Sequence, residues 1–514
     1  MSNINLRWGE WKEKPAQIPG ESITRDMTAD VVVVGAGIAG MSCALRAAQT
    51  GAEVIVLEQS SSWTARGMNI GIIDSGFMKE RGWDYKAEEV AREWIKICGN
   101  RCDERIVWLF LKNGGRAMDW ILDIVTREEY GCNVRIYGCV YNGEKYRELK
   151  TSHWITDGVM SKKGDRQSVA EVINAMHNEG RKLGARYIFK TRAEQLVKEN
   201  ARVSGVLAKD EDGYIQVNAR RGVVLATGDI GGNSSMCEDL APIANRCTKT
   251  VSWPKNGNLG DGHRMGLWAG GALEDTPFAT IIHPQAFGYI QYCFLHIKPD
   301  GTRFMSEDNG VQGKSLALIR EKEQHGWAIA DSDWPSKVPP TLEFGGGMFW
   351  GHNFFRGEDE VFDVDQMKEG FKRGIAAGNI VSGDTPESLA EKMGVPAKTF
   401  AATLERYNKL CESGTDEDFG KRRELMIPID KPPFFGMKYG PALLAVVGGL
   451  RVDTKMRVLD ESGKPVAGLH AIGNVAGGRY GVDYPMLVPG NSCGSALTFG
   501  YLLGEALGSI QIVL

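Results

Sequence analysis

The sequence lacks several features that would define other classes of protein. It has no apolar run of 18 residues, so no membrane span is predicted. Basic and acidic residues nearly balance, 61 against 65, and the net charge of −4 gives no reason to expect binding to nucleic acid. The ten cysteines are scattered without a C-x-x-C pair, the closest being Cys98 and Cys102. This spacing excludes a zinc knuckle, an iron–sulfur cysteine run and a haem attachment motif, and no metal site is predicted.

The chain is long and rich in glycine. Its 514 residues are too many for one ordinary core and predict two or three domains. The 64 glycines occur in separate clusters, which indicates tight turns and close approaches of the backbone to a ligand. Residues 1–28 are polar and have neither an apolar signal segment nor twin arginines. We expect this tail to wrap over the body or to be partly disordered, and the scattered cysteines favour a cytoplasmic location.

Residues 29–60 have the pattern of a strand–helix–strand unit. Val31–Val34 is typical of a buried strand, residues 38–50 of a helix and residues 54–57 of a second strand. The segment Gly35-Ala36-Gly37-Ile38-Ala39-Gly40 between them is a complete G-x-G-x-x-G. In this motif the first glycine permits the turn, the second admits a pyrophosphate, and the third lets helix and strand pack closely. Glu58 ends the second strand, where it can accept hydrogen bonds from ribose hydroxyls.

The rest of the chain divides by composition into two further regions. A nucleotide-binding domain is expected over residues 29–274 and again over 426–514, with a capping domain inserted over 275–425. Helices are expected at 84–127, 167–183 and 494–507, and short strands over 186–225 with a hairpin near 210–213. In the inserted region, strong helices are expected only around 386–412.

Seven segments, in order, resemble the fumarate reductase/succinate dehydrogenase flavoprotein family, which includes urocanate reductases and 3-ketosteroid dehydrogenases. They are VVVVGAGIAG with VIVLEQS, RGMNIG, LATGDIGGN, GNLGDGHRMGLWAGG, GTRFMSED, GGLRVDTKMRV with GLHAIGNVAGG, and GNSCGSALTFGYLLGEAL. The resemblance implies the α/β class: a Rossmann-like FAD-binding domain with an inserted α+β capping domain, and a substrate site between the two.

Carried over position by position, the resemblance also implies the residues that contact FAD. They are Gly35, Gly37, Ile38, Ala39, Gly40, Glu58, Gln59, Arg66, Gly67, Met68, Asn69, Gly71, Ala193, Thr227, Gly228, Asp261, Asn474, Ser495, Ala496 and Leu497. Asn474 stands where the family commonly has a glutamate that contacts the ribityl chain, and an amide can still hydrogen-bond a hydroxyl. Because no histidine stands near Arg66-Gly67-Met68, the FAD is expected to be non-covalent.

The groups with which the family binds fumarate are largely missing. No arginine occurs at 308–313, after GTRFMSE, and the C-terminal loop has Arg479, Tyr480 and Tyr484 where the family has histidine and arginine. His283-Pro284 resembles a His-Pro that binds a carboxylate, and Tyr484-Pro485 resembles the Tyr-Pro of 3-ketosteroid dehydrogenases. The candidate catalytic residues are therefore Tyr480, Tyr484, His283 and Arg479, with Tyr289 and Tyr292 as aromatic neighbours. Ordinary packing remains the alternative for the tyrosines and His283, and a surface charge for Arg479. Arg303 is expected to hold the cap in place.

These residues predict an FAD-dependent oxidoreductase that acts on a CH–CH bond but does not reduce fumarate. The expected reaction reduces a C=C conjugated to a carbonyl by hydride transfer from flavin N5, while a tyrosine polarises the carbonyl or relays the proton. The alternatives are a 3-ketosteroid-type dehydrogenase and a flavin electron-transfer subunit. The sequence has no second nucleotide motif, so the expected partners are a small unsaturated carbonyl substrate and a separate electron donor, either a redox protein or NADH.

Overall fold

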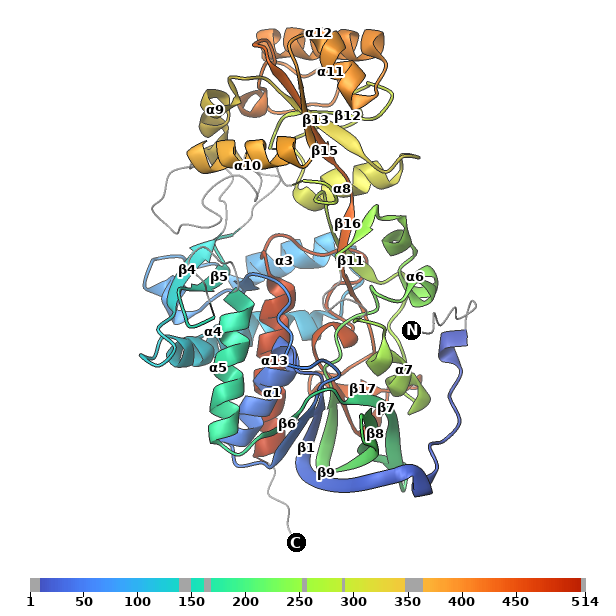
Figure 1. Cartoon of the computed structure of the whole chain (residues 1–514). Helices are drawn as coiled ribbons and strands as arrows, with labels where there is room; N and C mark the ends of the chain where they lie inside the picture. Colours follow the sequence, from blue (N-terminus) through green and yellow to red (C-terminus); the bar gives the residue numbers. More distant parts are fainter. Residues whose placement is uncertain are drawn as a thin grey trace.

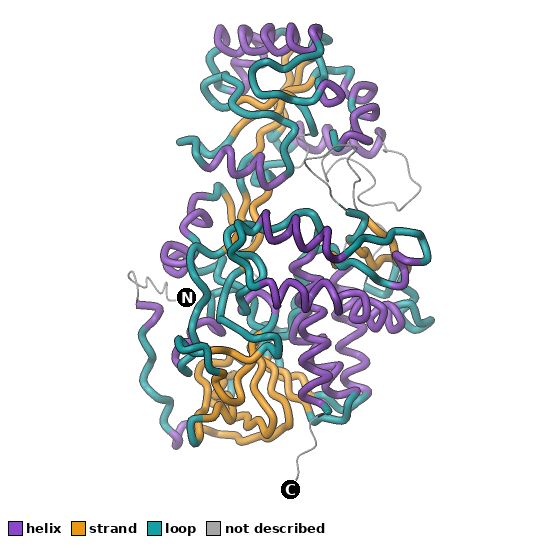
Figure 2. Tube along the Cα trace, turned by 180° about the vertical axis from the view of Figure 1, so that it is seen from behind, coloured by secondary structure: helices purple, strands orange, loops and turns teal. Residues whose placement is uncertain are grey.

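The chain folds into a large α/β body and a smaller cap (Figure 1). The computed structural model describes residues 10–137, 149–160, 168–251, 257–288, 292–346 and 364–509. The body is Rossmann-like, and we use the word cap for the inserted α+β part, described over residues 292–346 and 364–439. Seen from behind, the strands of the body form one layer beside a bundle of helices (Figure 2). Among the described residues no helix is both long and apolar enough to cross a membrane.

The body is built on an eight-stranded sheet whose centre is parallel. Its strands are β1 (Ile23–Val34), β2 (Val54–Leu57), β6 (Arg186–Ile188), β7 (Arg192–Glu199), β8 (Arg202–Asp210), β9 (Gly213–Leu225), β17 (Arg457–Leu459) and β18 (Pro465–Ala471). The order β18-β9-β1-β2-β6 is parallel throughout, while β7 and β8 extend antiparallel from β9. The run Val31–Val34 at the centre is buried, as a strand covered on both faces requires.

Two helices that are far apart in the sequence pack closely beside this sheet. They are α1 (Ile38–Gln49) and α13 (Asn491–Gly508). A Cβ on Gly500 would lie 2.5 Å from the carbonyl oxygen of Ala39, and one on Gly504 would lie 2.5 Å from that of Cys43. The two glycines therefore let the backbones approach more closely than any side chain would allow. The bundle also contains α4 (Glu104–Val125) and α5 (Ser168–Lys182).

Two small sheets and four further helices complete the described part of the body. Two three-stranded sheets are formed by β3 (Ile70–Gly71), β4 (Asn133–Tyr137) and β5 (Ser152–Thr156), and by β10 (Lys249–Thr250), β11 (Ala279–His283) and β16 (Ala442–Val447). The remaining helices of the body are α2 (Gly76–Lys79), α3 (Ala87–Ile97), α6 (Ser234–Leu240) and α7 (Asp261–Trp268). The expected helical stretch at 84–127 is thus two helices, α3 and α4, because the segment between them turns at Gly99 and Asn100 with positive φ.

The cap contains a four-stranded antiparallel sheet with helices around it. The strands are β12 (Leu295–Ile297), β13 (Gly326–Ala330), β14 (Ile380–Gly383) and β15 (Phe434–Tyr439), and the helices are α8 (Val311–Ile319), α9 (Trp334–Lys337), α10 (Val364–Ala376), α11 (Pro386–Met393) and α12 (Ala397–Ser413). Strong helices were expected here only around 386–412, where α11 and α12 lie, so α8 and α10, together with the four-residue α9, differ from that expectation. The cap sheet also extends past the expected boundary at residue 425, since β15 pairs with β13 and β14.

The N-terminal segment wraps over the body, as one of the two expectations for it stated. Trp11 is buried, and its indole Nε1 donates to the carboxylate of Asp239 at 2.6 Å. Further on, the Gln195 side chain donates to the carbonyl oxygen of Ala16. The tail is shorter than expected, because β1 already begins at Ile23.

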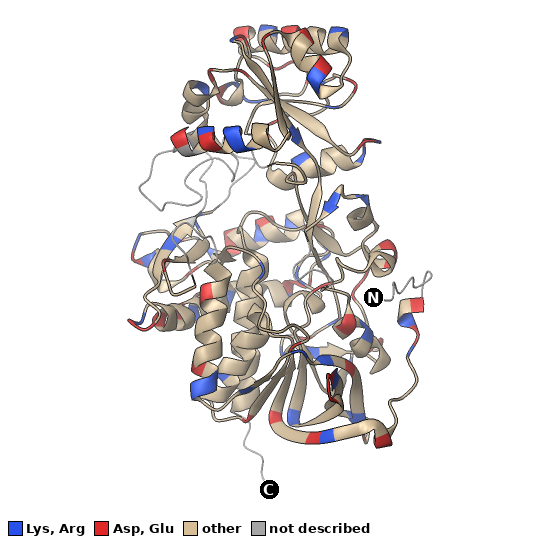
Figure 3. Cartoon of the chain, viewed as in Figure 1, with Lys and Arg blue, Asp and Glu red and all other residues tan. Residues whose placement is uncertain are grey.

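Positive and negative residues are mixed over both the body and the cap in the view of Figure 3.

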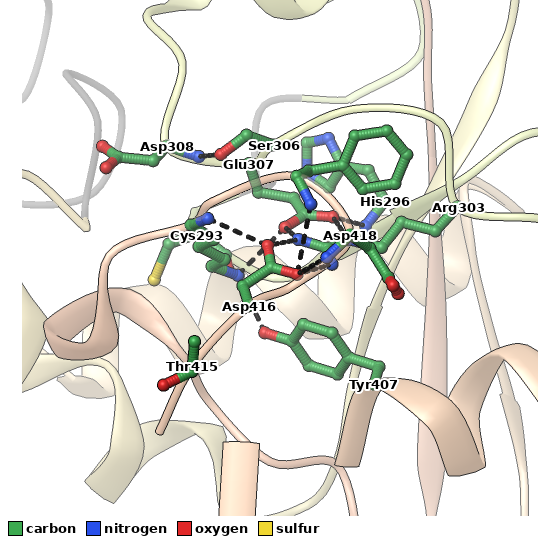
Figure 4. Close-up of polar contacts among 12 residues, drawn as sticks. Cys293, His296, Arg303, Ser306, Glu307, Asp308, Tyr407, Thr415, Asp416 and Asp418 are labelled. Carbon is green, nitrogen blue, oxygen red and sulfur yellow. Dashed lines mark hydrogen bonds and ion pairs between the residues drawn. The ribbon is translucent and has the colours of Figure 1, made fainter. Parts of the chain in front are cut away.

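A buried ion-pair cluster holds the cap together (Figure 4). The guanidinium of Arg303 donates to the carboxylates of Glu307 and Asp416, at 2.8–2.9 Å in each of four contacts. The Lys421 ammonium adds an ion pair with Glu307 at 3.2 Å and donates to the Tyr407 hydroxyl at 2.8 Å. Arg303 therefore joins the segment after β12 to the segment after α12, which is the structural role expected for it.

Candidate active site

The glycine-rich loop between β1 and α1 forms one wall of a cavity of about 540 Å³, the nucleotide cavity. Gly35 has a φ of 109°, and a Cβ there would lie 2.4 Å from the carbonyl oxygen of Ala226. A Cβ on Gly40 would lie 1.9 Å from the carbonyl oxygen of Gly35. Gly37 differs, because a Cβ there would meet no atom within 4 Å. Gly35 and Gly40 thus close the turn, and Gly37, the N-cap of α1, leaves its side-chain position open to a ligand.

Glu58 fastens this loop from the end of β2. One carboxylate oxygen accepts from the backbone N–H of Ala36 at 2.8 Å, and the other accepts from that of Ser60 at 2.8 Å. The side chain is 7% exposed and lines the cavity. Because each carboxylate oxygen has a second lone pair, Glu58 can still accept from ligand hydroxyls.

A second helix begins at the same cavity. Gly490 caps α13 with a φ of 82°, and Ser492, Cys493 and Ala496 of its first turns line the wall. The Ser492 hydroxyl donates to the side-chain oxygen of Asn474 at 3.1 Å. The N-terminal ends of α1 and α13 therefore both border the nucleotide cavity, and unpaired N–H groups at helix N-termini attract anions.

The hydroxyl oxygen of Thr227, which follows β9, is buried in the wall and lacks a partner within the described part of the chain. The same holds for the side-chain oxygen of Gln285. Buried hydroxyls almost always hydrogen-bond, so the Thr227 hydroxyl indicates a missing polar ligand. Together with the open position at Gly37 and the free lone pairs of Glu58, it shows that the residues present fit a dinucleotide.

The structure brings most of the expected cofactor residues to this cavity. Its lining includes Gly35, Gly37, Ile38, Ala39, Glu58, Gln59, Arg66, Gly67, Met68, Asn69, Ala193, Thr227, Gly228, Asp261, Asn474 and Ala496. Four expected residues lie behind the wall instead, namely Gly40, Gly71, Ser495 and Leu497. Gly71 lets β3 approach the loop before α13, since a Cβ there would lie 2.2 Å from the carbonyl oxygen of Pro489. The backbone oxygen of Leu497 accepts from the Ser42 hydroxyl in the contact between α13 and α1.

Tyr484 is the expected catalytic residue with the most suitable position. It lines the nucleotide cavity and also a neighbouring cavity of about 700 Å³ between body and cap, the inter-domain cavity. The backbone N–H of Ser492 donates to its hydroxyl oxygen at 3.1 Å. Burial raises the pKa of the Tyr484 phenol well above its usual value, so the hydroxyl keeps its proton. Since the oxygen accepts from Ser492, the proton of Tyr484 remains available for donation.

His283 also lines the nucleotide cavity, at the end of β11. Burial lowers the pKa of its imidazole to about 3, so the ring is neutral at ordinary pH. A neutral imidazole can donate or accept one hydrogen bond, but it does not provide the positive charge with which a carboxylate clamp works.

Tyr480 and Arg479 line neither cavity. The Tyr480 hydroxyl donates to the side-chain oxygen of Asn491 at 2.8 Å, and its ring stacks on Trp94 at 5.9 Å between centroids. The buried Arg479 guanidinium donates to the Ser495 hydroxyl at 2.5 Å and to the carbonyl oxygen of Gly473 at 2.7 Å. Both side chains thus support the loop that carries Tyr484. Tyr292 is buried in a core cluster of the cap, and Tyr289 lies outside the described residues.

Several lining residues have no signal in the sequence. On the substrate side they are Ile281, Gln285, Leu444, Ala445 and Met486, and around the nucleotide Thr191, Arg192, Asn258 and Cys493. Leu444 and Ala445 belong to an apolar strand, β16, whose pairing with β11 places it at the cavity. Met486 is shared with the inter-domain cavity, like Tyr484.

The fold and the two cavities define a dinucleotide-binding oxidoreductase with a capping domain. The FAD binding domain family matches residues 30–491, and the chain belongs to this family. Its cofactor is FAD, and the chain is an FAD-dependent oxidoreductase, as the sequence predicted.

Known proteins agree with this assignment. A vinyl phenol reductase of Lactiplantibacillus plantarum is 28% identical, over 92% of this chain and 94% of that protein. An NADH:fumarate oxidoreductase of Klebsiella pneumoniae is 25% identical over 93% of this chain, which spans only 47% of its length. The crystal structure of a 3-ketosteroid-delta4-(5alpha)-dehydrogenase from Rhodococcus jostii superimposes with a TM-score of 0.71 at 23% identity, covering 95% of this chain and 99% of that one. At 23% identity, the likeness to the Rhodococcus structure concerns the fold alone.

Proposed function

We propose that the protein reduces the C=C bond of an uncharged alkene that is conjugated to a carbonyl group or to a phenol ring. The observation that carries this proposal is the position of Tyr484, a protonated phenol at the junction of the nucleotide and inter-domain cavities. In a reduction of this kind one alkene carbon receives hydride and the other receives a proton, so the site needs a hydride source and a proton donor.

Tyr484 meets the second need. Its hydroxyl is oriented by the Ser492 N–H at the start of α13, and it can donate to a carbonyl oxygen or transfer its proton to carbon. Burial of both Tyr484 and His283 keeps water away from the donor. His283, neutral and on the opposite element β11, would orient the polar end of the substrate by one hydrogen bond.

FAD bound non-covalently against Gly37, Glu58, Thr227 and the N-terminus of α13 would supply the hydride. The geometry supports this set of residues, since these groups have room or hydrogen-bonding capacity directed at the cavity. Nothing in this proposal requires a metal.

The charges on the cavity walls favour an uncharged substrate. In the nucleotide cavity Arg66 pairs with Asp229 and Arg192 pairs with Asp261, so both cations are already neutralised. Of the described residues that line the inter-domain cavity, Arg320 is basic, whereas Glu93, Glu321 and Asp483 are acidic. A dicarboxylate such as fumarate would meet more negative than positive charge there.

The names of the relatives support a reaction at a C=C or CH–CH bond and leave open whether the enzyme reduces or dehydrogenates its substrate. The Lactiplantibacillus relative is a vinyl phenol reductase, and a vinyl phenol is an uncharged alkene conjugated to an aromatic ring. A relative from Mycolicibacterium smegmatis, 25% identical, is a 3-oxosteroid 1-dehydrogenase. Dehydrogenation of a cyclic ketone is therefore the second candidate, and Tyr484-Pro485, which resembles the steroid enzymes, favours it.

The electron donor and the location are further proposals. We infer a separate redox protein as donor, with NADH as the alternative, because the sequence has a single G-x-G-x-x-G. A cytoplasmic location remains a prediction from the scattered cysteines.

The test uses holoenzyme reduced under anaerobic conditions and mixed with one compound at a time. We expect 4-vinylphenol, cinnamaldehyde or 2-cyclohexenone to reoxidise the flavin, while cinnamate and fumarate do so much more slowly. A 3-ketosteroid added to oxidised enzyme with a dye acceptor tests the second candidate. The proposal is wrong if fumarate reoxidises the flavin as fast as the uncharged alkenes, or if none of the uncharged compounds does so.

A further inference from the structure

Two cysteines lie together in the connection between α3 and α4, beside the active-site loop. Cys98 caps the end of α3 and is buried, whereas Cys102, just before Asp103, the N-cap of α4, is partly exposed. The two thiols hydrogen-bond each other. They are the closest pair of cysteines in the sequence, and the proposed reduction makes no use of them.

The same connection packs against the loop that carries Tyr484. The Cys98 sulfur lies 3.6 Å from the carbonyl oxygen of Asp483 and 3.8 Å from that of Arg479. The backbone N–H of Asp103 donates to the carbonyl oxygen of Gly478 at 2.7 Å. A Cβ on Gly481 would lie 2.8 Å from the carbonyl oxygen of Cys98. Any movement of Cys98 is therefore passed directly to residues 478–484.

The two thiols differ in the way that an attacking and a resolving cysteine differ. The hydrogen bond with Cys98 lowers the pKa of the Cys102 thiol, and Cys102 also lies at the N-terminal end of a long helix. The hydrogen bond with Cys102, together with burial, raises the pKa of the Cys98 thiol. A partly exposed, more acidic thiol next to a buried partner is the usual arrangement of a thiol redox sensor.

We propose that Cys98 and Cys102 form a reversible disulfide when the protein meets an oxidised low-molecular-weight thiol, and that this disulfide slows the enzyme. The Cys102 thiolate attacks the small disulfide, forms a mixed disulfide and releases one small thiolate. The Cys98 sulfur then attacks the Cys102 sulfur and releases the second small thiol. In total, two protein thiols are oxidised to one disulfide, and one small disulfide is reduced to two thiols.

The effect on activity rests on the proposed function, but the modification does not. The disulfide removes the thiol proton of Cys98, whose sulfur lies 3.8 Å from the carbonyl oxygen of Arg479 and 3.6 Å from that of Asp483, and it draws Cys98 toward Cys102. Tyr484, which lines the nucleotide cavity, then shifts. We expect turnover to fall about tenfold or more, because a small misplacement near the reacting groups costs up to ~100-fold in rate. The absorption spectrum of the bound flavin changes at the same time.

The peptide experiment follows from the sequence around the pair. Trypsin cleaves after Lys96, Arg101 and Arg105, so the cysteines fall in adjacent peptides, residues 97–101 and 102–105. Native holoenzyme is incubated with oxidised glutathione, its free thiols are blocked, and it is digested without reductant. We expect the two peptides to be found as one disulfide-linked species that disappears after dithiothreitol. Cys98→Ser and Cys102→Ser each abolish it, and Cys411→Ser, in the cap, does not.

The outcomes separate this proposal from the proposed function. The proposal is supported if folded holoenzyme gives the linked peptide together with a change in the flavin spectrum and slower turnover. Dithiothreitol should reverse these changes, and Cys98→Ser should prevent them. Absence of the linked peptide unless urea is added overturns it, and so does a linked peptide that leaves both turnover and the flavin spectrum unchanged. If the reduced protein turns over no alkene at all, the proposed function fails. The linked peptide and the flavin spectrum then still test whether the Cys98–Cys102 disulfide forms and affects the site.

Discussion

The side chain of Gln312 donates a hydrogen bond to the carboxylate of Asp483, which joins helix α8 of the cap to the loop that carries Tyr484. The amide oxygen of Gln312 at the same time accepts from the backbone N–H of Ile282 at 3.1 Å, next to His283. One amide thus links the segments of two cavity residues, His283 and Tyr484. The backbone N–H of Tyr484 also donates to Asp483, at 2.8 Å.

We predict that Gln312→Glu lowers kcat about tenfold at neutral pH. The variant keeps the shape and the acceptor for Ile282, but it replaces a donor with a carboxylate that repels Asp483, and losing a buried hydrogen bond to a charged group costs about 1.5–3 kcal/mol. Burial raises the pKa of Asp483, so lowering the pH lets the two carboxyls share a proton. The pH profile of kcat should therefore recover on the acid side. Gln216→Glu, on β9, is the control, and equal loss in both variants would contradict the prediction.

Tyr484→Phe should lower the rate of flavin reoxidation by an alkene by about 10²–10⁴-fold, the usual contribution of a positioned proton donor. Tyr480→Phe is a matched control that removes a hydroxyl from the same loop. Because Tyr480 bonds Asn491 and lines neither cavity, its loss should cost about 1 kcal/mol of stability and little rate. Stopped-flow reoxidation measures the first effect and urea unfolding the second. Similar rates in both variants would rule out Tyr484 as the donor.

Gly37→Ala should weaken FAD binding without unfolding the apoprotein. The added methyl group finds no atom within 4 Å in the protein and so takes up only ligand space. Overpacking costs about 1–3 kcal/mol, which corresponds to about a fivefold to 150-fold rise in the Kd for FAD. Gly20→Ala, likewise with no atom within 4 Å but away from the cavity, is the control. Quenching of flavin fluorescence on binding reports the Kd, and an unchanged value would place the cofactor elsewhere.

Glu274 should make stability fall as the pH rises. Burial raises the pKa of its carboxyl to about 7, although the N–H groups of Gly478 and Gly449 donate to it. Since an unfolded glutamate titrates near 4.5, the folded state binds more protons between about pH 4.5 and about pH 7. The free energy of unfolding attributable to this group is therefore largest at the acid end and is lost toward pH 7. Urea unfolding of Glu274→Gln should show a flatter pH dependence over this window, and a parallel curve would refute the assignment.

Arg303→Leu should destabilise the cap by about 3–5 kcal/mol, because it leaves the carboxylates of Glu307 and Asp416 buried without their partner. Arg406→Leu is the comparison, since Arg406 pairs with Glu417 and Asp418 at the surface, where such pairs contribute about 0–1 kcal/mol. Urea unfolding followed by the cap tryptophans reports both. Equal losses of unfolding free energy in the two variants would contradict a buried ion-pair cluster around Arg303.

Local pattern was enough to predict the nucleotide-binding end of the fold. The apolar run Val31–Val34, the glycines and the helix after them lie in one continuous stretch. Gly35 and Gly40 there each have a steric reason, and Gly37 leaves its side-chain position open to a ligand. The family is also confirmed, since seven ordered segments are hard to produce by chance.

The sequence could not predict which side chains of one loop reach the cavity. Tyr480 and Tyr484 are four positions apart and chemically identical. Tyr480 is directed by its contacts with Trp94 and Asn491, and Tyr484 by its contact with Ser492. Nor could local pattern place β15 in the cap sheet, because its partners β13 and β14 are about 50 to 110 residues earlier in the chain. Such pairings depend on tertiary packing.

The strands β15 and β16 are separated by only Gly440 and Pro441, yet they belong to different sheets. The first is held in the cap, and the second pairs with β11 in the body (Figure 1). Leu444 and Ala445 of β16 line the nucleotide cavity. Because the connection is only two residues long, a displacement of β15 also moves β16. If the cap rotates, Leu444 and Ala445 should move against the bound flavin and change its absorption, so the cofactor would report the position of the cap even when no substrate is turned over.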